Sequence, residues 1–217
     1  MMQTIKQLDA ITVNKIAAGE VIDRPVSIVK ECLENALDAG ATSIVVSVQN
    51  GGIDQIKLTD NGHGISKLDL PFAPIRHATS KINQIEDIYN TDTFGFRGEA
   101  LASICHCAKL TIQSRHQSAD KGYEITAYHD TISTPEICAH STGTTIDIRD
   151  LFSDLPVRRK FLKSPATELS YITEIVMQFA LVHPDKDFTL ISNGQEKINS
   201  KGLYKHEHLL VKFYGKN

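Results

Sequence analysis

The strongest constraint on this chain is an amphipathic helix near its N-terminus. The sequence predicts that this helix begins at Asp23-Arg24-Pro25 and closes at Gly40, a length of about four turns. Asp23 is expected to cap the first N–H groups, Pro25 suits the first turn, and Gly40 supplies the left-handed residue that commonly ends a helix. At about 100° per residue, one arc is apolar and the opposite arc is polar: Val26, Val29, Leu33, Ala36 and Leu37 against Glu31, Glu34, Asn35 and Asp38. The apolar arc needs a core, whereas the polar arc is either solvated or part of a site.

Length and composition favour a globular protein with one substantial core. The 217 residues are 41% hydrophobic, which allows one core and the beginning of a second domain. No apolar run approaches the roughly 20 residues of a membrane helix, and residues 1–7 lack the apolar region of a signal peptide. We therefore expect an intracellular protein, cytoplasmic in a bacterium or nuclear in a eukaryote.

Charge and cysteine usage narrow the classes further. The four cysteines follow no regular spacing, so reduced thiols are expected instead of a disulfide scaffold. A net charge of −3 gives no general attraction for nucleic acid. The strongest basic cluster, Arg158-Arg159-Lys160 with Lys163, is either a phosphate contact or a solvated turn after Pro156. Cys105-His106-Cys107 and Cys138-Ala139-His140 are poorly spaced for zinc, which favours ordinary packing of the thiols.

Alternating apolar residues predict a sheet covered by helices. Residues 43–48 and 54–59 have the composition of two strands, and Gly51-Gly52 between them makes a hairpin plausible. Further strands are predicted at 109–114, 123–128, 144–148 and 188–192, with a turn at Asn193-Gly194. Helices are predicted at 99–104 and 166–182, and a short one at 68–75. A sheet of several strands with helices on one face follows.

Two segments have no predicted secondary structure. Residues 76–98 form a long polar connection, and connections of that length in compact domains are usually lids, binding loops or disordered segments. Residues 201–217 are basic and mixed in character, without an obvious terminal element. We expect that this second segment belongs to a truncated chain.

A carboxylate and two glycines stand where the second strand ends. Asp60-Asn61-Gly62-His63-Gly64 is compatible with an ordinary turn, but a turn does not require the second glycine. Glycine lets backbone approach a ligand closely, and a carboxylate fixed at a strand end can accept a hydrogen bond from an exocyclic amine such as that of adenine. The segment is therefore a candidate base-binding site.

Three further segments have features of phosphate or base contacts. Residues 93–101 form a glycine-bearing loop that leads directly into a helix, where free N–H groups and Arg97 suit phosphate. His77-Ala-Thr-Ser-Lys81 adds hydroxyls and an ammonium group, although a solvated loop has the same composition. Thr142-Gly-Thr-Thr145 precedes a strand and is compatible with a plain turn. The phosphate loop of P-loop enzymes, the dinucleotide-binding glycine motif and the serine-hydrolase elbow do not occur in the sequence.

In combination these motifs resemble the GHKL ATPases. The four-part order is Glu31-x-x-x-Asn35, Asp60-Asn-Gly-x-Gly64, Gly95-Phe-Arg-Gly-Glu-Ala-Leu101 and Gly143-Thr144. Longer boxes resemble, more narrowly, the N-terminal ATPase of the MutL mismatch-repair family: Ile16-Ala-Ala-Gly-Glu-Val-Ile22, Leu37-Asp-Ala-Gly-Ala41, and His77 to Lys81. The resemblance covers residues 16–161. It implies a two-layer α+β sandwich, in which a mixed sheet is covered on one face by helices.

The resemblance also implies a role for each motif, with ATP and Mg²⁺ as the cofactors. Glu31 would be the general base that polarises the attacking water. Asn35 would offer its amide oxygen to Mg²⁺, and Asp60 would read the adenine amine. The remaining implied contacts to the nucleotide are Gly62, Gly64, Thr79, Ser80, Lys81, Gly95, Phe96, Arg97, Gly98, Glu99, Ala100, Leu101 and Thr144.

At the level of the whole protein, the resemblance implies an ATP-driven dimerisation switch with slow hydrolysis. The implied domains are an ATP-binding domain with an N-terminal arm, residues 1–200, and the start of a second domain, residues 201–217. That second domain would contribute a lysine to the γ-phosphate, so weak hydrolysis is expected of this chain. The implied partners are a MutS-type mismatch-recognition protein, a downstream endonuclease and helicase, and DNA, bound weakly and mainly through parts outside this chain.

Two alternatives remain open at this stage. The same fold can serve as a nucleotide-binding or protein-interaction scaffold without productive hydrolysis. A kinase of the same superfamily would instead transfer the phosphoryl group to a protein acceptor.

Overall fold

Strands account for much of the chain that the computed structural model describes, residues 22–79 and 98–215. They are β1 (Ser43–Gln49), β2 (Gln55–Asp60), β3 (Lys109–Arg115), β4 (Gly122–Tyr128), β5 (Thr131–Ile132), β6 (Glu136–Cys138), β7 (Gly143–Arg149), β8 (Asp187–Ser192) and β9 (Gln195–Asn199). Within those residues they form one sheet of order β5-β4-β3-β7-β2-β1-β8-β9, with β6 paired to β4. β1 and β8 pair in parallel, while β1 with β2 and β2 with β7 pair antiparallel. The predicted mixed α+β fold is confirmed.

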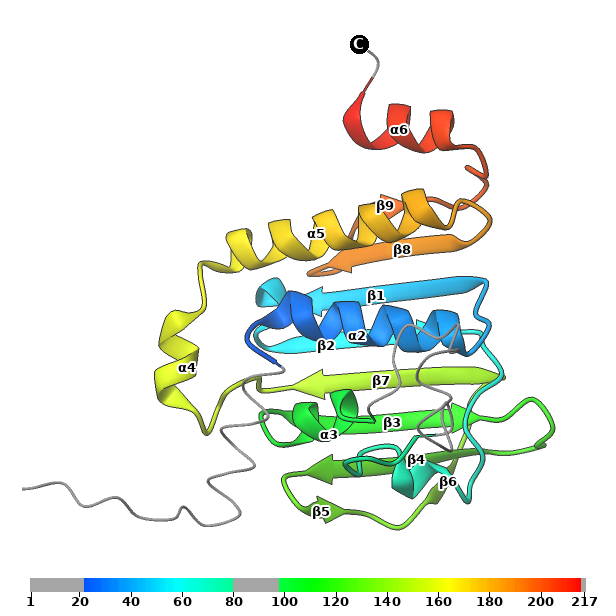
Figure 1. Cartoon of the computed structure of the whole chain (residues 1–217), viewed down its shortest axis with the longest axis vertical. Helices are drawn as coiled ribbons and strands as arrows, with labels where there is room; N and C mark the ends of the chain where they lie inside the picture. Colours follow the sequence, from blue (N-terminus) through cyan, green and yellow to red (C-terminus); the bar gives the residue numbers. More distant parts are fainter. Residues whose placement is uncertain (1–21, 80–97, 216–217) are drawn as a thin grey trace, which may run out of the picture.

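Helices cover one face of this sheet (Figure 1). The described helices are α2 (Pro25–Asp38), α3 (Ala100–Cys105), α4 (Pro156–Phe161), α5 (Pro165–Val182) and α6 (His206–Tyr214), with short 3₁₀ turns η1 (Asn50–Gly52) and η2 (Leu70–Phe72). The helices on the sheet are α2, α3 and α5, whereas Figure 1 shows α4 and α6 beside it. α2 lies over β1 and β2 and contacts both α3 and α5. None of the described helices is long and apolar enough to cross a membrane.

The core lies between α2, α5 and the inward side chains of the strands. Alternate residues of each strand are buried, as a period of two requires, and these include Ile44, Val46, Ile56, Leu58, Ile112, Ile146 and Leu190. α2 contributes Ile28, Val29, Cys32, Leu33 and Ala36 to the same cluster. Val26 and Leu37, predicted inside the apolar arc, lie at its rim and are half-buried. The arc is therefore centred on Cys32 and Ala36.

The two ends of α2 differ in how well the sequence predicted them. Ala39 is the C-cap, Gly40 has φ of +72°, and the N–H groups of Gly40 and Ala41 donate to the carbonyls of Leu37 and Ala36 at 2.9 and 3.0 Å. These two bonds are the Schellman closure that glycine favours, so the predicted end is confirmed.

The predicted cap at the start of α2 is wrong. Arg24 is the N-cap and makes no side-chain cap hydrogen bond. Asp23 lies one residue too early, and its Oδ1 accepts instead from the Ser27 hydroxyl at 2.5 Å.

The predicted strands and the two long helices are confirmed, as is the hairpin between β1 and β2. The structure adds β9 after the predicted turn, together with β5 and β6, which are too short to show a period in the sequence. Residues 156–161, for which the sequence left a phosphate contact and a solvated turn as alternatives, form a helix with no buried residue. The predicted lack of a terminal element after residue 200 is wrong, because α6 buries Leu209 and packs on α5. The domain boundary at 200/201 stays a prediction.

Truncating Leu33 tests whether α2 is held mainly by its buried face. Leu33 has no exposed surface, so Leu33→Ala should lower the free energy of unfolding by about 2–5 kcal/mol. The control is Leu68→Ala, because Leu68 is 80% exposed and its truncation should cost about 0.5 kcal/mol or less. Urea unfolding followed by circular dichroism measures both. Equal losses in the two variants would contradict the packing described for α2.

Candidate functional site

A row of buried polar side chains marks the place where the apolar core ends. Asp60 pairs with Thr144 across β2 and β7, and Thr144 pairs with Ser114 across β7 and β3. Side chains at such positions share one face of the sheet, which here is the face under α2. All three residues are at least 93% buried. The next row inward on the same strands is wholly apolar: Leu58, Ile146 and Ile112.

Asp60 is a carboxylate held in a largely apolar environment. Burial raises its pKa, and four effects oppose that rise: hydrogen bonds from the backbone N–H groups of Gly62 and Thr144, and the charges of His140 and His63. The Gly62 N–H donates to Oδ1 at 2.8 Å. This local bond closes the turn that follows β2 and fixes one carboxylate oxygen. The sequence placed Asp60 correctly at the strand end.

The turn after Asp60 is tied to the surrounding elements. Oδ1 of Asn61 accepts from the N–H groups of Thr42 and Ser43 at 2.8 and 2.9 Å, which joins the turn to the start of β1. The His63 N–H donates to the Ala39 carbonyl at 2.9 Å, which joins it to the end of α2. Asn61 is therefore a structural residue of the motif.

The glycines around Asp60 allow three backbone segments to touch. Gly64 has φ of +72°, and a Cβ there would lie 2.1 Å from the Arg115 carbonyl oxygen. Gly143 has φ of +122°, and a Cβ there would lie 2.1 Å from the Asp60 carbonyl oxygen. L-residues with side chains avoid such φ values and such distances. The second glycine of the motif is thus required by packing of the protein on itself.

Glu31 and Asn35 stand on α2 above this row, one turn apart and both half-buried. The Cys32 thiol lies under the same helix and is fully buried. Its pKa rises to about 12 because of burial first, and then because the negative charges of Glu31 and Asp60 both reach it. The helix carboxylate and the strand carboxylate therefore both lie within electrostatic range of one buried thiol.

Glu34 occupies the same polar arc in a different role. Its Oε1 pairs with Lys30 Nζ at 2.9 Å, one turn back on α2. The bond to Glu34 is also the main reason that the pKa of Lys30 is raised. This pair supports keeping Glu34 out of the candidate site.

The two segments predicted to contact phosphate, residues 77–81 and 93–101, are in contact through their described parts, residues 77–79 and 98–101. The His77 N–H donates to the Gly98 carbonyl at 3.1 Å, and a Cβ on Gly98 would lie 2.4 Å from the Ala78 carbonyl oxygen. His77 Nδ1 lies 3.7 Å from Glu99 Oε1. Thr79, the residue that follows Ala78, is half-buried. Residues 77–78 and residues 98–99 therefore lie next to one another.

The remaining predicted residues fall into two groups. Glu99 is the N-cap of α3, and Ala100 and Leu101 form its first turn. The other predictions lie outside the described residues: Ser80, Lys81, Gly95, Phe96 and Arg97. Sequence reasoning missed Ser114, although it falls on the inward phase of a predicted strand, where a polar residue is the exception.

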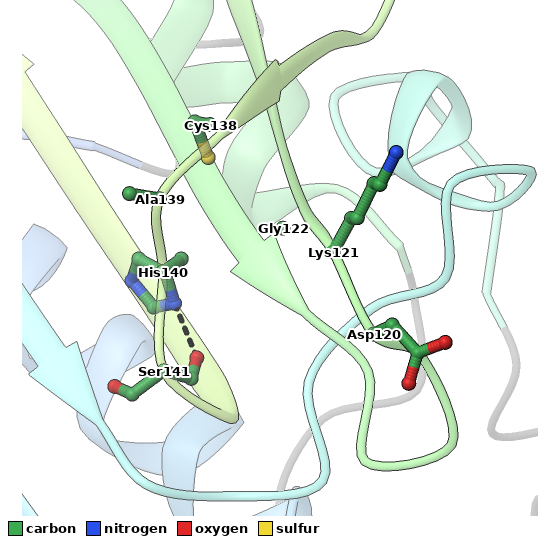
Figure 2. A pocket seen from close by; sticks show the side chains of 7 residues that line it. All are labelled: Asp120, Lys121, Gly122, Cys138, Ala139, His140 and Ser141. Atoms are coloured by element: carbon green, nitrogen blue, oxygen red, sulfur yellow. Dashed lines mark hydrogen bonds between the residues drawn. The ribbon is translucent and has the colours of Figure 1, made fainter.

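The cysteine and histidine pairs do not assemble into a four-ligand group. Cys105 and Cys107 donate to carbonyls within α3, at 3.1 Å to Ala102 and 3.3 Å to Ser103. Cys138 and His140 instead line a hollow between the segments 120–122 and 138–141 (Figure 2). No cluster of three or more potential metal ligands occurs in residues 22–79 and 98–215.

His140 connects this hollow to the polar row. Its Nδ1 donates to the Ser141 carbonyl at 2.6 Å, as Figure 2 shows, and its Nε2 lies 2.9 Å from Thr145 Oγ1. Thr145 is the neighbour of Thr144 and points to the other face of the sheet, where its hydroxyl meets that of Thr59 at 3.0 Å. A positive charge on His140 would therefore act on Asp60 through the sheet.

Comparison with known proteins assigns this arrangement to a family. The model of the histidine kinase-, DNA gyrase B-, and HSP90-like ATPases matches residues 24–149, which are more than half of the chain and include α2, Asp60 and Thr144. The chain therefore belongs to this ATPase family.

Within that family the resemblance to MutL is confirmed. The DNA mismatch repair protein MutL of Coxiella burnetii (strain CbuG_Q212) is 49% identical over 200 residues, which cover 92% of this chain and 35% of the relative. The structure of the Aquifex aeolicus MutL ATPase domain complexed with ADP has a TM-score of 0.73 and 32% identity, and covers 89% of this chain and 70% of that chain. A crystal structure of the N-terminal domain of a DNA repair protein has a TM-score of 0.81 and 28% identity, and covers 96% of this chain and 62% of that chain. The chain spans about a third of the Coxiella relative's length.

Replacing Asp60 by Asn tests whether the buried carboxylate is a cost to the fold. Its pKa is raised in the folded state, so its contribution to stability is greatest below the unfolded pKa of about 3.9 and declines as pH rises through the folded value. Asn keeps an oxygen for the Gly62 N–H. Asp60→Asn should therefore be at least as stable as wild type at pH 7, and this advantage should shrink as pH falls toward 4.

Urea unfolding across that pH range measures the effect. The control is Asp54→Asn, just before the opposite end of β2, where Asp54 is exposed. An Asp60→Asn protein that is less stable than wild type at pH 7 would contradict the assignment.

Proposed function

We propose that this chain binds ATP with Mg²⁺ and hydrolyses it slowly. The observation that carries the proposal is the buried Asp60, which is fixed by the Gly62 N–H and lies beneath the helix that presents Glu31 and Asn35. An ionised carboxylate only accepts hydrogen bonds, so Asp60 suits the exocyclic amine of adenine. Gly62 and Gly64 would line the base pocket, with Thr144 beside Asp60 on the adjacent strand.

Glu31 is the proposed general base, and Asn35 the proposed magnesium ligand. Mg²⁺ prefers oxygen ligands and is usually held by one or two protein groups together with phosphate oxygens, which the Asn35 amide oxygen fits. When bound, the ion would neutralise charge on the phosphates. Glu31, one turn away on the same polar arc, would orient the attacking water and accept its proton.

The phosphates are assigned to the segments that meet around Gly98. Thr79, Glu99, Ala100 and Leu101 contribute from the described residues. Ser80, Lys81, Gly95, Phe96 and Arg97 complete the proposed set. Contact between the Ala78 and Gly98 backbones supports this assignment, because it brings one predicted phosphate segment, residues 77–81, next to the other, residues 93–101.

For the protein to which the chain belongs, we propose an ATP-driven dimerisation switch in DNA mismatch repair. The partners would be a MutS-type mismatch-recognition protein, a downstream endonuclease and helicase, and DNA, and the location would be intracellular. Support comes from the identity to MutL, together with the general ability of a bound γ-phosphate to order loops and shift a conformational equilibrium.

Removing the Glu31 carboxylate separates binding from chemistry. A general base typically contributes at least about 100-fold to the rate, so Glu31→Ala should lower ATP hydrolysis by about that factor while ADP still binds. The matched control is Glu34→Ala on the same helix. Its loss of an i,i+4 ion pair is worth about 0.3–0.5 kcal/mol and should leave hydrolysis nearly unchanged.

Phosphate release and isothermal titration with ADP measure the two properties. Unchanged hydrolysis in Glu31→Ala would remove Glu31 from its proposed role. Hydrolysis that is absent from wild type, with ADP still bound, would favour the scaffold alternative. Label from [γ-³²P]ATP that appears on protein instead of as free phosphate would favour a kinase.

Asp60 is tested by the loss of nucleotide binding. Asp60→Asn places an amide N–H₂ group where the adenine amine needs an acceptor. A hydrogen bond to a charged group contributes about 1.5–3 kcal/mol, so the affinity for ADP should fall about 10- to 100-fold. Asp54→Asn should leave it unchanged. ADP binding by Asp60→Asn at the wild-type affinity would exclude Asp60 as the base contact.

A further inference from the structure

Ser114 is the member of the buried polar row that the proposed chemistry does not use. It lies in β3 with no exposed surface, two strands away from Asp60. Its hydroxyl oxygen is 2.8 Å from the Gly143 carbonyl oxygen, 2.8 Å from the Ile65 nitrogen and 2.9 Å from Thr144 Oγ1. One side chain thus joins the turn after β2, the start of β7 and the Thr144 hydroxyl.

A count of protons decides how the Thr144 hydroxyl is oriented. A carbonyl oxygen only accepts, so Ser114 donates its proton to Gly143. The Ile65 N–H only donates, so Ser114 accepts there through one lone pair. Since the Ser114 proton is committed, the contact at 2.9 Å requires Thr144 to donate its own proton to Ser114. Thr144 Oγ1 is left with lone pairs and no proton for any other group.

We propose that Ser114 is a positioning residue that makes Thr144 an obligatory hydrogen-bond acceptor beside Asp60. This proposal rests on the proposed function, and it deepens it by naming a residue that enforces the choice of base. With an ionised carboxylate and an acceptor-only hydroxyl on neighbouring strands, the row offers two acceptors. It therefore selects bases that present an amino group and disfavours those that present a carbonyl oxygen at the same position.

Hypoxanthine is the sharpest probe of this selection, because it carries a carbonyl oxygen where adenine carries the amino group. Asp60 by itself disfavours that oxygen. In Ser114→Ala, however, the Thr144 hydroxyl is released and can rotate to donate to it. The variant should therefore bind ADP more weakly and lose part of its preference for ADP over inosine diphosphate (IDP). The acceptor-only hydroxyl predicts a fall of about tenfold in the ratio of the two affinities, the equivalent of about one hydrogen bond.

The experiment is isothermal titration of the 217-residue chain with Mg-ADP and Mg-IDP. Ser200→Ala is the matched control, because Ser200 is also buried and its hydroxyl also serves two backbone groups, accepting from the Phe188 N–H at 2.8 Å and donating to the Lys186 carbonyl at 3.4 Å. Any general effect of removing a buried hydroxyl appears in both variants, while the ADP/IDP ratio should change only in Ser114→Ala. Ser114→Thr, which keeps the hydroxyl, should restore the ratio.

A double-mutant cycle tests whether Ser114 acts through Thr144. Thr144→Val should lower the ratio alone, and adding Ser114→Ala to it should lower the ratio no further. Thr144→Val also serves as the test if Ser114→Ala does not fold, since an unchanged ratio in Thr144→Val would overturn the proposal.

Equal weakening of both nucleotides in Ser114→Ala would reduce Ser114 to a structural role and overturn the proposal, while the proposed function stands. Wild-type protein that binds neither nucleotide would overturn the proposed function itself, and this inference with it.

Discussion

The burial of α2 against the sheet is the interaction on which the rest of the structure depends. Val29 and Leu33 are fully buried on one side of a 14-residue helix, and Glu31 and Asn35 stand half-buried on the other side. Because a helix is a rigid element with a fixed angle between residues, packing of the apolar arc also sets the direction of the polar one. The same contacts that stabilise the fold therefore position the two residues proposed to act on the phosphates.

At the floor of the site, the sheet keeps a carboxylate in an unfavourable environment. Burial raises the pKa of Asp60, and the N–H groups of Gly62 and Thr144 offset part of that cost. The hydroxyl of Ser114 extends the arrangement to a third strand. Glycines at positions 64 and 143 are needed because the three backbone segments pack too closely for side chains. Polar groups that are satisfied by such a network are held in one geometry before any ligand binds.

Electrostatics link the helix and the sheet as one unit. The Cys32 thiol, buried between them, is affected by the charges of both Glu31 and Asp60. Glu34 is paired with Lys30 and so belongs to the stability of the helix. Glu31 and Glu34 share one polar arc, but the ion pair with Lys30 assigns Glu34 to the helix itself, whereas Glu31 is the residue proposed to act on the nucleotide.

The sequence by itself determined the elements whose signals are local. The period of α2, its closure at Gly40, the hairpin after β1 and the position of Asp60 at a strand end all follow from spacing and from single residues with restricted conformations. The motif order also identified the family. Local signals failed at the cap of α2, where one residue decides whether Asp23 reaches backbone N–H groups or the Ser27 hydroxyl, and at α6, where burial of Leu209 depends on contact with α5.

Only the tertiary structure decided which polar residues share one place. Asp60 and Thr144 are more than 80 residues apart in the sequence, and Ser114 and Thr144 are 30 apart. Strand register brings all three into one row. In the sequence, Ser114 is an ordinary serine at a strand end, and Asn61 is an ordinary turn residue. Register between distant strands sets which hydroxyl donates to which carbonyl. That choice depends on long-range pairing, about which the local pattern of residues carries no information.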